Sequence, residues 1–174
     1  MEWRGRQMQV SGVSAEVPDL SREEVRRFWD PGPKLIRAVR RYQAARARGG
    51  LWGRIVSKVW VLDHHVWSVL CQSELHLNTR IGGGLRLTHP TGIIVHPGTV
   101  IGVNCMIFQQ VTITEGVTLG GHVDVGAGAK IIGPVTIGDH VVIGANAVVT
   151  ADVPSGVTVA GIPARIISTG APRS

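Results

Sequence analysis

An aliphatic residue recurs at every sixth position of the chain over residues 95–149. The series runs without a failure through Val95, Ile101, Ile107, Ile113, Leu119, Val125, Ile131, Ile137, Ile143 and Val149. A second small or β-branched residue follows each of them four positions later. A period of six does not fit an amphipathic helix; it predicts a parallel β-helix with three short strands in each coil. An ordinary β-sandwich would instead show period-two strands separated by turns of variable length.

The six-residue frame slips by two residues between Leu87 and Val95. Before the slip the aliphatic positions are Ile81, Leu87 and Ile93, and the slipped segment, THPTGIIVH, contains His89. A break in an otherwise strict pattern tends to occur where function requires it. The break therefore makes His89 a candidate functional residue.

The residues before the repeat differ in composition from those within it. Residues 1–72 contain 13 of the 18 lysines and arginines and all five tryptophans, whereas 17 of the 23 glycines come later. Such a change indicates two kinds of structure joined near residue 73. We predict a mainly β chain with a flexible arm, an α-helical region, a β-helix and a short tail, over residues 1–17, 18–72, 73–167 and 168–174.

Three helices are expected in the helical region. Ser21 and Glu24 form a capping box, so the first helix should begin at Ser21 and end at the Asp-Pro-Gly-Pro segment from Asp30. The second is expected over residues 34–48. The third is expected over residues 51–72, where apolar residues at three- and four-residue spacing form a stripe that needs a partner surface.

The second expected helix carries a cluster of arginines, namely Arg37, Arg40, Arg41, Arg46 and Arg48. One interpretation is a solvated helix face. The other is a patch that contacts an anionic surface, carrier or polymer. No base-reading motif accompanies the cluster, so nucleic-acid binding is not expected.

The sequence carries no signal for export or for a membrane span. Its first residues, MEWRGRQMQV, lack an apolar run after the charges, and no stretch of about 18 apolar residues occurs. The two cysteines, Cys71 and Cys105, are too few for a disulfide framework. We therefore expect a cytoplasmic protein.

Three segments of the repeat region form a recognisable series. They are GLRLTHPTGIIVHPGTVIGVNCMIFQQVTI, VGAGAKIIGPVTIGDHVVIGANAVVTADVP and AGIPARII. Together they resemble the serine acetyltransferase family of hexapeptide-repeat acyltransferases, and the short helical leader is similar to the polysaccharide-associated branch. The resemblance implies a left-handed parallel β-helix and acetyl-CoA as co-substrate, without a permanently bound cofactor or a metal. It also implies a homotrimer, or a multiple of three, with active sites between subunits.

The resemblance further implies roles for particular residues. The family's catalytic histidine falls on His89 and its carboxylate partner on Glu74. Histidine suits the removal of a proton from an alcohol near neutral pH, and a carboxylate on its second ring nitrogen would fix the tautomer. Backbone contacts to coenzyme A fall on Ala127 and Ala145, one coil apart. Further candidate contacts to coenzyme A are Lys130, Gly161 and Arg165.

Departures from the family concern the acceptor. Thr88 stands where serine acetyltransferases carry an aspartate, and the repeat continues through VTITEGVTLGGHVDVG, where they carry a loop with an Arg-His-Pro element. No arginine lies between Arg86 and Arg165, so a substrate carboxylate would lack its usual cationic partner. We therefore predict an O-acetyltransferase for a sugar or another non-serine hydroxyl compound, with L-serine O-acetylation as the alternative. Thr88, His76 and His96 are the candidate acceptor contacts.

Two remoter alternatives remain open. His122 and His140 are one coil apart, and Asn104 lies one coil earlier. Trimeric β-helices of the γ-carbonic anhydrase type hold zinc with three histidines, although their ligand spacing is absent here. The other alternative is a non-enzymatic scaffold, and the presence of both Glu74 and His89 argues against it.

Overall fold

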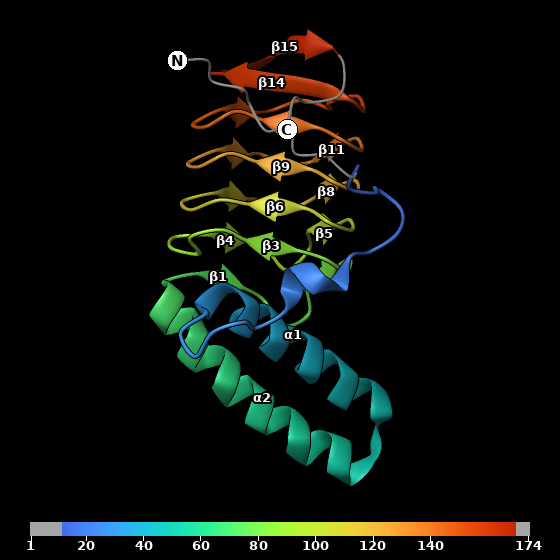
Figure 1. The fold of residues 1–174 in the computed structure, drawn as a ribbon, viewed down its shortest axis with the longest axis vertical. Helices are drawn as coiled ribbons and strands as arrows, with labels where there is room; N and C mark the ends of the chain where they lie inside the picture. Colours follow the sequence, from blue (N-terminus) through green and yellow to red (C-terminus); the bar gives the residue numbers. More distant parts are fainter. Residues whose placement is uncertain (1–11, 170–174) are drawn as a thin grey trace, which may run out of the picture.

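The main body of the molecule is a parallel β-helix of about five coils, seen from the side in Figure 1. The computed structural model describes residues 12–169. Each regular coil gives one short strand to each of three sheets, because three six-residue units complete one coil. The predicted left-handed β-helix with an N-terminal α-helical region is thereby confirmed.

The three sheets run along the coil stack, and their neighbouring strands are parallel except for the last pair. The first sheet contains β1 (Glu74–Leu75), β4 (Ile94–Val95), β7 (Thr112–Ile113), β10 (Lys130–Ile131) and β13 (Val148–Val149). The second contains β2 (Arg80–Ile81), β5 (Val100–Ile101), β8 (Val117–Leu119) and β11 (Val135–Ile137). The third contains β3 (Arg86–Leu87), β6 (Met106–Ile107), β9 (Asp124–Val125), β12 (Val142–Ile143), β14 (Val157–Gly161) and the antiparallel β15 (Ala164–Thr169).

The six-residue ladder forms the core of the β-helix. Ile107, Ile131 and Ile137 are completely buried, and the small residues four positions after the ladder positions, such as Ala129, are buried as well. Strands of two residues cannot bury an apolar face alone, so each coil depends on its neighbours for stability.

The frame slip enlarges one corner of the first coil. Leu75 pairs with Val95 and Leu87 with Ile107, an offset of 20 residues, whereas Ile94 pairs with Thr112 at the regular offset of 18. The two extra residues therefore lie between β3 and β4, in the segment that contains His89. The sequence prediction of a two-residue slip at this place is confirmed.

A hairpin of two helices closes one end of the β-helix (Figure 1). Helix α1 (Pro31–Arg48) buries Leu35, Ile36 and Val39 in the same core cluster as the first coil. Helix α2 (Gly50–Cys71) follows after a turn at Gly49, whose φ is +66°. Both helices were expected, but α1 begins three residues earlier than predicted. The Pro31-Gly32-Pro33 segment forms its first turn because proline fits there without a lost hydrogen bond.

The first expected helix is wrong in length and in its cap. Only Leu20–Glu23 is helical, as a 3-10 turn, and Asp19 rather than Ser21 caps it by accepting from the Ser21 N–H. Residues 1–11 of the predicted arm lie outside the described residues. Ser14–Pro18 instead run along a corner of the β-helix, where the Asn104 side chain donates to Ser14 O and Val17 O at 2.7 and 2.8 Å.

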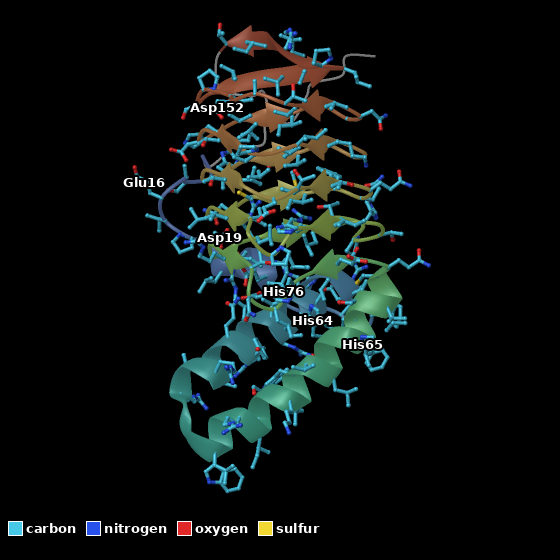
Figure 2. All side chains as sticks on the ribbon, turned by 180° about the vertical axis from the view of Figure 1, so that it is seen from behind. Glu16, Asp19, His64, His65, His76 and Asp152 are labelled. Carbon is cyan, nitrogen blue, oxygen red and sulfur yellow. The ribbon has the colours of Figure 1, made fainter. Side chains whose placement is uncertain are left out.

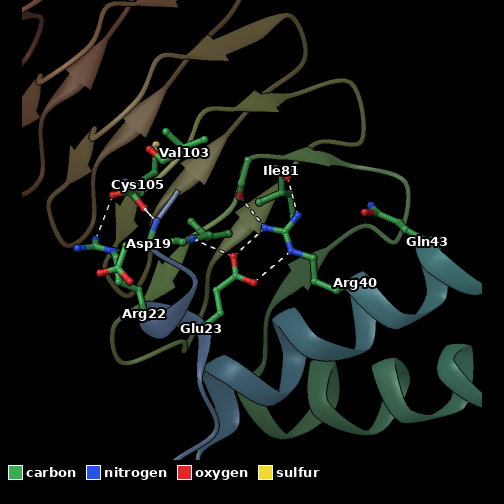
Figure 3. A network of polar contacts seen from close by, with 12 residues as sticks. Asp19, Arg22, Glu23, Arg40, Gln43, Ile81, Val103 and Cys105 are labelled. Carbon is green, nitrogen blue, oxygen red and sulfur yellow. Dashed lines mark hydrogen bonds and ion pairs between the residues drawn. The ribbon is translucent and has the colours of Figure 1, made fainter. Parts of the chain in front are cut away.

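One arginine of the predicted cluster, Arg40, joins α1 to the first coil and to the 3-10 turn. The Arg40 guanidinium contacts the Glu23 carboxylate at 2.7 Å and donates to Ile81 O and Gly82 O of the first coil (Figure 3). Glu23 in turn accepts from the Leu85 N–H at 3.1 Å. The other four arginines of the cluster are exposed, namely Arg37, Arg41, Arg46 and Arg48. Their exposure fits both interpretations of the cluster, a solvated helix face and an anion-binding patch. Within residues 12–169, no helix is long and apolar enough to cross a membrane.

Candidate functional site

His89 lies in the enlarged corner between β3 and β4, and its side chain is exposed. The corners between the third and first sheets each have one residue in the left-handed region, and these residues stack as Gly92, Gln110, Gly128 and Asn146. His89, with φ of +51°, is an additional left-handed residue that the regular coils lack. Left-handed φ costs a non-glycine residue free energy, so this conformation must be held by its surroundings.

Ser73, directly after helix α2, holds this corner. Its buried hydroxyl donates to Pro90 O and accepts from the Ile93 N–H at 3.1 Å. The preceding residue, Gln72, accepts from the Gly92 N–H at 3.0 Å. The end of α2 therefore fixes both sides of the loop that carries His89.

A cleft of about 630 Å³ lies beside His89. One wall consists of β3 and the residues after it, including Arg86 and Thr88. The other consists of the 3-10 turn, the irregular segment after it and the start of α1. This wall brings three further arginines to the cleft, Arg22 from the turn and Arg26 and Arg27 from the irregular segment. The cleft beside His89 thus contains cationic side chains that come from outside the repeat, which the sequence expectation did not consider.

Thr88 adds an unpaired polar group to the same cleft. Its hydroxyl oxygen is buried and has no hydrogen-bond partner within the described residues, although Thr88 N donates to Ile107 O at 2.9 Å. A buried hydroxyl without a partner is costly. Thr88 therefore lines the cleft, as its predicted contact with an acceptor requires, but its hydroxyl oxygen is shielded and would have to turn outward to reach a ligand.

Glu74 lies in β1, and its side chain is exposed like that of His89. Its backbone N–H donates to Ile93 O at 2.8 Å, just beyond the His89 corner. No hydrogen bond or ion pair joins the two side chains in the part of the chain that is described. Glu74 and His89, the predicted catalytic pair, therefore lie on neighbouring segments, but their side chains are not in contact.

The predicted coenzyme A contacts lie along the same edge of the β-helix as His89. The edge is continuous, because Gln110 N donates to Thr91 O, Gly128 N to Gln109 O and Asn146 N to Ala127 O at 2.8–2.9 Å. Ala127 and Ala145 occupy adjacent coils of this edge, as the repeat predicts.

Three further candidates lie on or near this edge. The Lys130 ammonium donates to Gln110 O at 2.6 Å, one coil away. Gly161, with φ of +98°, ends β14 at the last corner, and Arg165 donates to its neighbour Ala164 O. Gly161 and Arg165 are thus at the far end of the coil stack from His89.

His76 and His96 lie at a different edge, between the first and second sheets. Each ring accepts a hydrogen bond from a backbone N–H two residues later, from Asn78 at 3.1 Å and from Gly98 at 3.2 Å. Figure 2 shows His76 close to His64, at the junction of the helices and the first coil. Neither histidine lines the cleft beside His89.

His122 and His140 stack at the third edge, with 2.9 Å between their Nδ1 atoms. Burial lowers the pKa of His122, and the nearby Asp124 opposes that effect. The third residue of the column, Asn104, accepts from the Asp19 N–H at 2.7 Å and donates to the N-terminal segment. A metal site at this edge would therefore rest on His122 and His140 alone, without the three histidines of the zinc alternative.

The two cysteines are poor candidates for nucleophiles. Burial raises the pKa of the Cys71 thiol to about 11 and that of Cys105 to about 12. The thiolate is the reactive form, so both thiols are protonated and inert near neutral pH.

Comparison with known proteins identifies the repeat. Residues 125–151 match the family model described as bacterial transferase hexapeptide (six repeats). A serine acetyltransferase of Synechococcus elongatus is 40% identical over 111 residues, which cover 59% of this chain and 46% of that protein. The chain spans about half the length of the curated relatives that it matches first.

Solved structures agree with the sequence comparison. The crystal structure of a serine acetyltransferase from Vibrio cholerae superposes with a TM-score of 0.67 and 33% identity, covering 84% of this chain and 57% of that one. A serine acetyltransferase in complex with CoA gives a TM-score of 0.67 and 33% identity, covering 80% and 57%. By sequence and by fold, the chain therefore belongs with the serine acetyltransferase-like family of hexapeptide-repeat acyltransferases.

Proposed function

We propose that the protein is an acetyl-CoA-dependent O-acetyltransferase and that His89 is its general base. The observation that carries the proposal is the enlarged corner of the first coil. It adds one exposed left-handed residue, His89, to the edge that also carries Ala127 and Ala145. A relative solved in complex with CoA supports acetyl-CoA as the co-substrate.

The proposed reaction needs one base and one polarised thioester. The acceptor hydroxyl oxygen attacks the thioester carbonyl carbon while its proton passes to a ring nitrogen of His89. Backbone N–H groups would stabilise the negative charge that develops on the carbonyl oxygen. The C–S bond then breaks, and the imidazolium returns the proton to the coenzyme A sulfur. Glu74 would stabilise that imidazolium after its exposed side chain turns toward His89.

The acceptor is a hydroxyl compound, and L-serine, the alternative from the sequence, has more support than the predicted sugar or other non-serine hydroxyl compound. The relatives are named serine acetyltransferases. The repeat does continue without an insertion where the family's basic loop would stand, because Ile107 pairs with Val125 at the regular offset. The arginines of the cleft nevertheless provide the cations that this loop would have supplied.

The assembly and the location are also proposals. We propose a homotrimer or a multiple of three, as the family resemblance implies, and a cytoplasmic location. We further propose that Lys130, Gly161 and Arg165 contact coenzyme A.

The test follows the release of free coenzyme A from acetyl-CoA with L-serine and a panel of neutral sugars as acceptors. We predict that His89→Asn lowers kcat by about 10² or more, the usual contribution of a general base, while the melting temperature changes little. His65→Asn is the matched control, because His65 is exposed on α2 and does not line the cleft beside His89. Wild-type turnover in His89→Asn would exclude His89 as the base, and release with no acceptor would reject the proposed activity.

A further inference from the structure

The cleft beside His89 combines the proposed general base with several guanidinium groups. Four of its lining residues are arginines, namely Arg22, Arg26, Arg27 and Arg86. We propose that Arg27 and Arg86 bind an anionic group, a carboxylate or a phosphate, of the hydroxyl acceptor. This inference rests on the proposed function, since it concerns the acceptor of the same site.

The four arginines differ in how many hydrogen-bond or ion-pair partners their side chains already have. Arg22 donates to two backbone carbonyl oxygens, Gly84 O and Asn104 O, both at 3.0 Å, and is therefore fixed in place. Arg26 lies 4.0 Å from Glu24, in a pair that is mostly exposed. No side chain within residues 12–169 forms a hydrogen bond or ion pair with Arg27 or Arg86. These two guanidinium groups are therefore open to a ligand.

The three carboxylates that line the cleft have partners of their own. Asp19 accepts from the Ser21 N–H and hydroxyl, and these bonds hold its pKa below the usual value. Asp30 accepts from the Arg26 N–H at 3.1 Å, and Glu24 lies beside the Arg26 side chain. Because these carboxylates face Ser21 and Arg26, they do not neutralise Arg27 and Arg86 directly.

Arg86 has a defined position relative to His89. It is the outward-facing residue of β3, next to the buried Leu87, and it precedes His89 by three residues. Arg27 comes from the opposite wall of the cleft, in the segment before α1. Guanidinium groups bind carboxylates and phosphates through paired hydrogen bonds. One guanidinium from each wall would hold the acceptor's anion between them while its hydroxyl reaches His89.

The test compares four three-carbon acceptors that differ in charge: glycerol, glycerate, glycerol 3-phosphate and L-serine. Coenzyme A release is measured with the wild type, Arg27→Gln, Arg86→Gln and the control Arg41→Gln, an exposed arginine on α1 outside the cleft. We expect at least one anionic or zwitterionic acceptor to be used, and glycerol to be used poorly. Arg27→Gln and Arg86→Gln should each raise the KM of that acceptor by about 10- to 100-fold, the usual loss for a charged hydrogen bond. The KM of acetyl-CoA and the kinetics of Arg41→Gln should stay unchanged.

Calorimetric titration of the same acceptors without acetyl-CoA separates this inference from the proposed function. Binding that is weakened by Arg27→Gln and Arg86→Gln supports the anion site even if no acceptor is acetylated. Equal use of glycerol and of its anionic analogues, with unchanged kinetics in both variants, would overturn the inference. An increase in the KM of acetyl-CoA alone would also overturn it, because the arginines would then bind coenzyme A. Selective use of glycerate, glycerol 3-phosphate or L-serine would identify the anion as a carboxylate, a phosphate or an amino-acid carboxylate.

Discussion

The hydroxyl of Ser73 connects the end of α2 to the corner that carries His89. Replacing Ser73 by alanine leaves Pro90 O without this donor and the Ile93 N–H without this acceptor. We predict that Ser73→Ala lowers the free energy of unfolding by about 1–3 kcal/mol, the usual cost of unsatisfied buried polar groups. It should also lower kcat more than it raises either KM, because it shifts His89 without removing a substrate contact.

The control for this prediction is Ser68→Ala, on the last turns of α2. The Ser68 hydroxyl has only a long contact of 3.4 Å to the His64 ring, so its loss should change neither kcat nor the position of His89. Threonine at position 73 would keep the hydroxyl, and Ser73→Thr should recover part of the activity. Equal kcat values for Ser73→Ala and the wild type would show that the loop keeps its shape without this serine.

The sequence identifies some of these residues and not others, for a physical reason. His89 can be found because it breaks a local pattern. Ala127 and Ala145 come from the family resemblance, and the repeat adds that they lie one coil apart. Ser73, Arg22 and Arg27 carry no such pattern. Their contribution depends on where an irregular segment and the end of a helix pass relative to the first coil, and no periodicity encodes that path.

At the scale of elements, an ion pair between Arg40 of α1 and Glu23 of the 3-10 turn adds to the apolar packing of α1 on the first coil. Arg40 and Glu23 are largely shielded from solvent, with side-chain exposures of 29% and 13%. Figure 3 shows that both also bind backbone groups of the coil. The same bonds explain why the predicted first helix is short. Glu23 and Arg22 are committed to the β-helix, and these tertiary contacts override the local helix propensity of the segment.

We predict that Arg40→Gln lowers the free energy of unfolding by about 2–4 kcal/mol, because it leaves the Glu23 carboxylate shielded and without its cation. Chemical denaturation monitored by circular dichroism measures the change. The exposed Arg41→Gln should stay within about 0.5 kcal/mol of the wild type. The double variant Arg40→Gln/Glu23→Gln should lose less than the sum of the two single variants. Additive losses would show that the pair is not coupled.

At the scale of the whole molecule, helix α2 presents an apolar face that nothing in residues 12–169 covers. Trp52 is 78% exposed, Val59 60% and Leu62 66%, and the spacing of these residues places them on one side of the helix. The sequence predicted that the apolar stripe of this helix needs a partner surface, and no described residue covers these side chains. Contiguous exposed apolar surface of this kind usually marks an interface.

We therefore predict that identical chains cover this face in an assembly of three or a multiple of three. Light scattering should give three or six times the chain mass of 18.6 kDa. The double variant Val59→Glu/Leu62→Glu introduces two charges into the face and should reduce the number of copies, because desolvating a charge in an apolar interface is unfavourable. Lys58→Glu, on an exposed position of the same helix, is the matched control and should keep the wild-type mass.

If α2 only joins trimers, the double variant should remain a trimer and keep its coenzyme A release, since the cleft beside His89 does not include α2. A wild-type protein that is monomeric and fully active would contradict the predicted assembly.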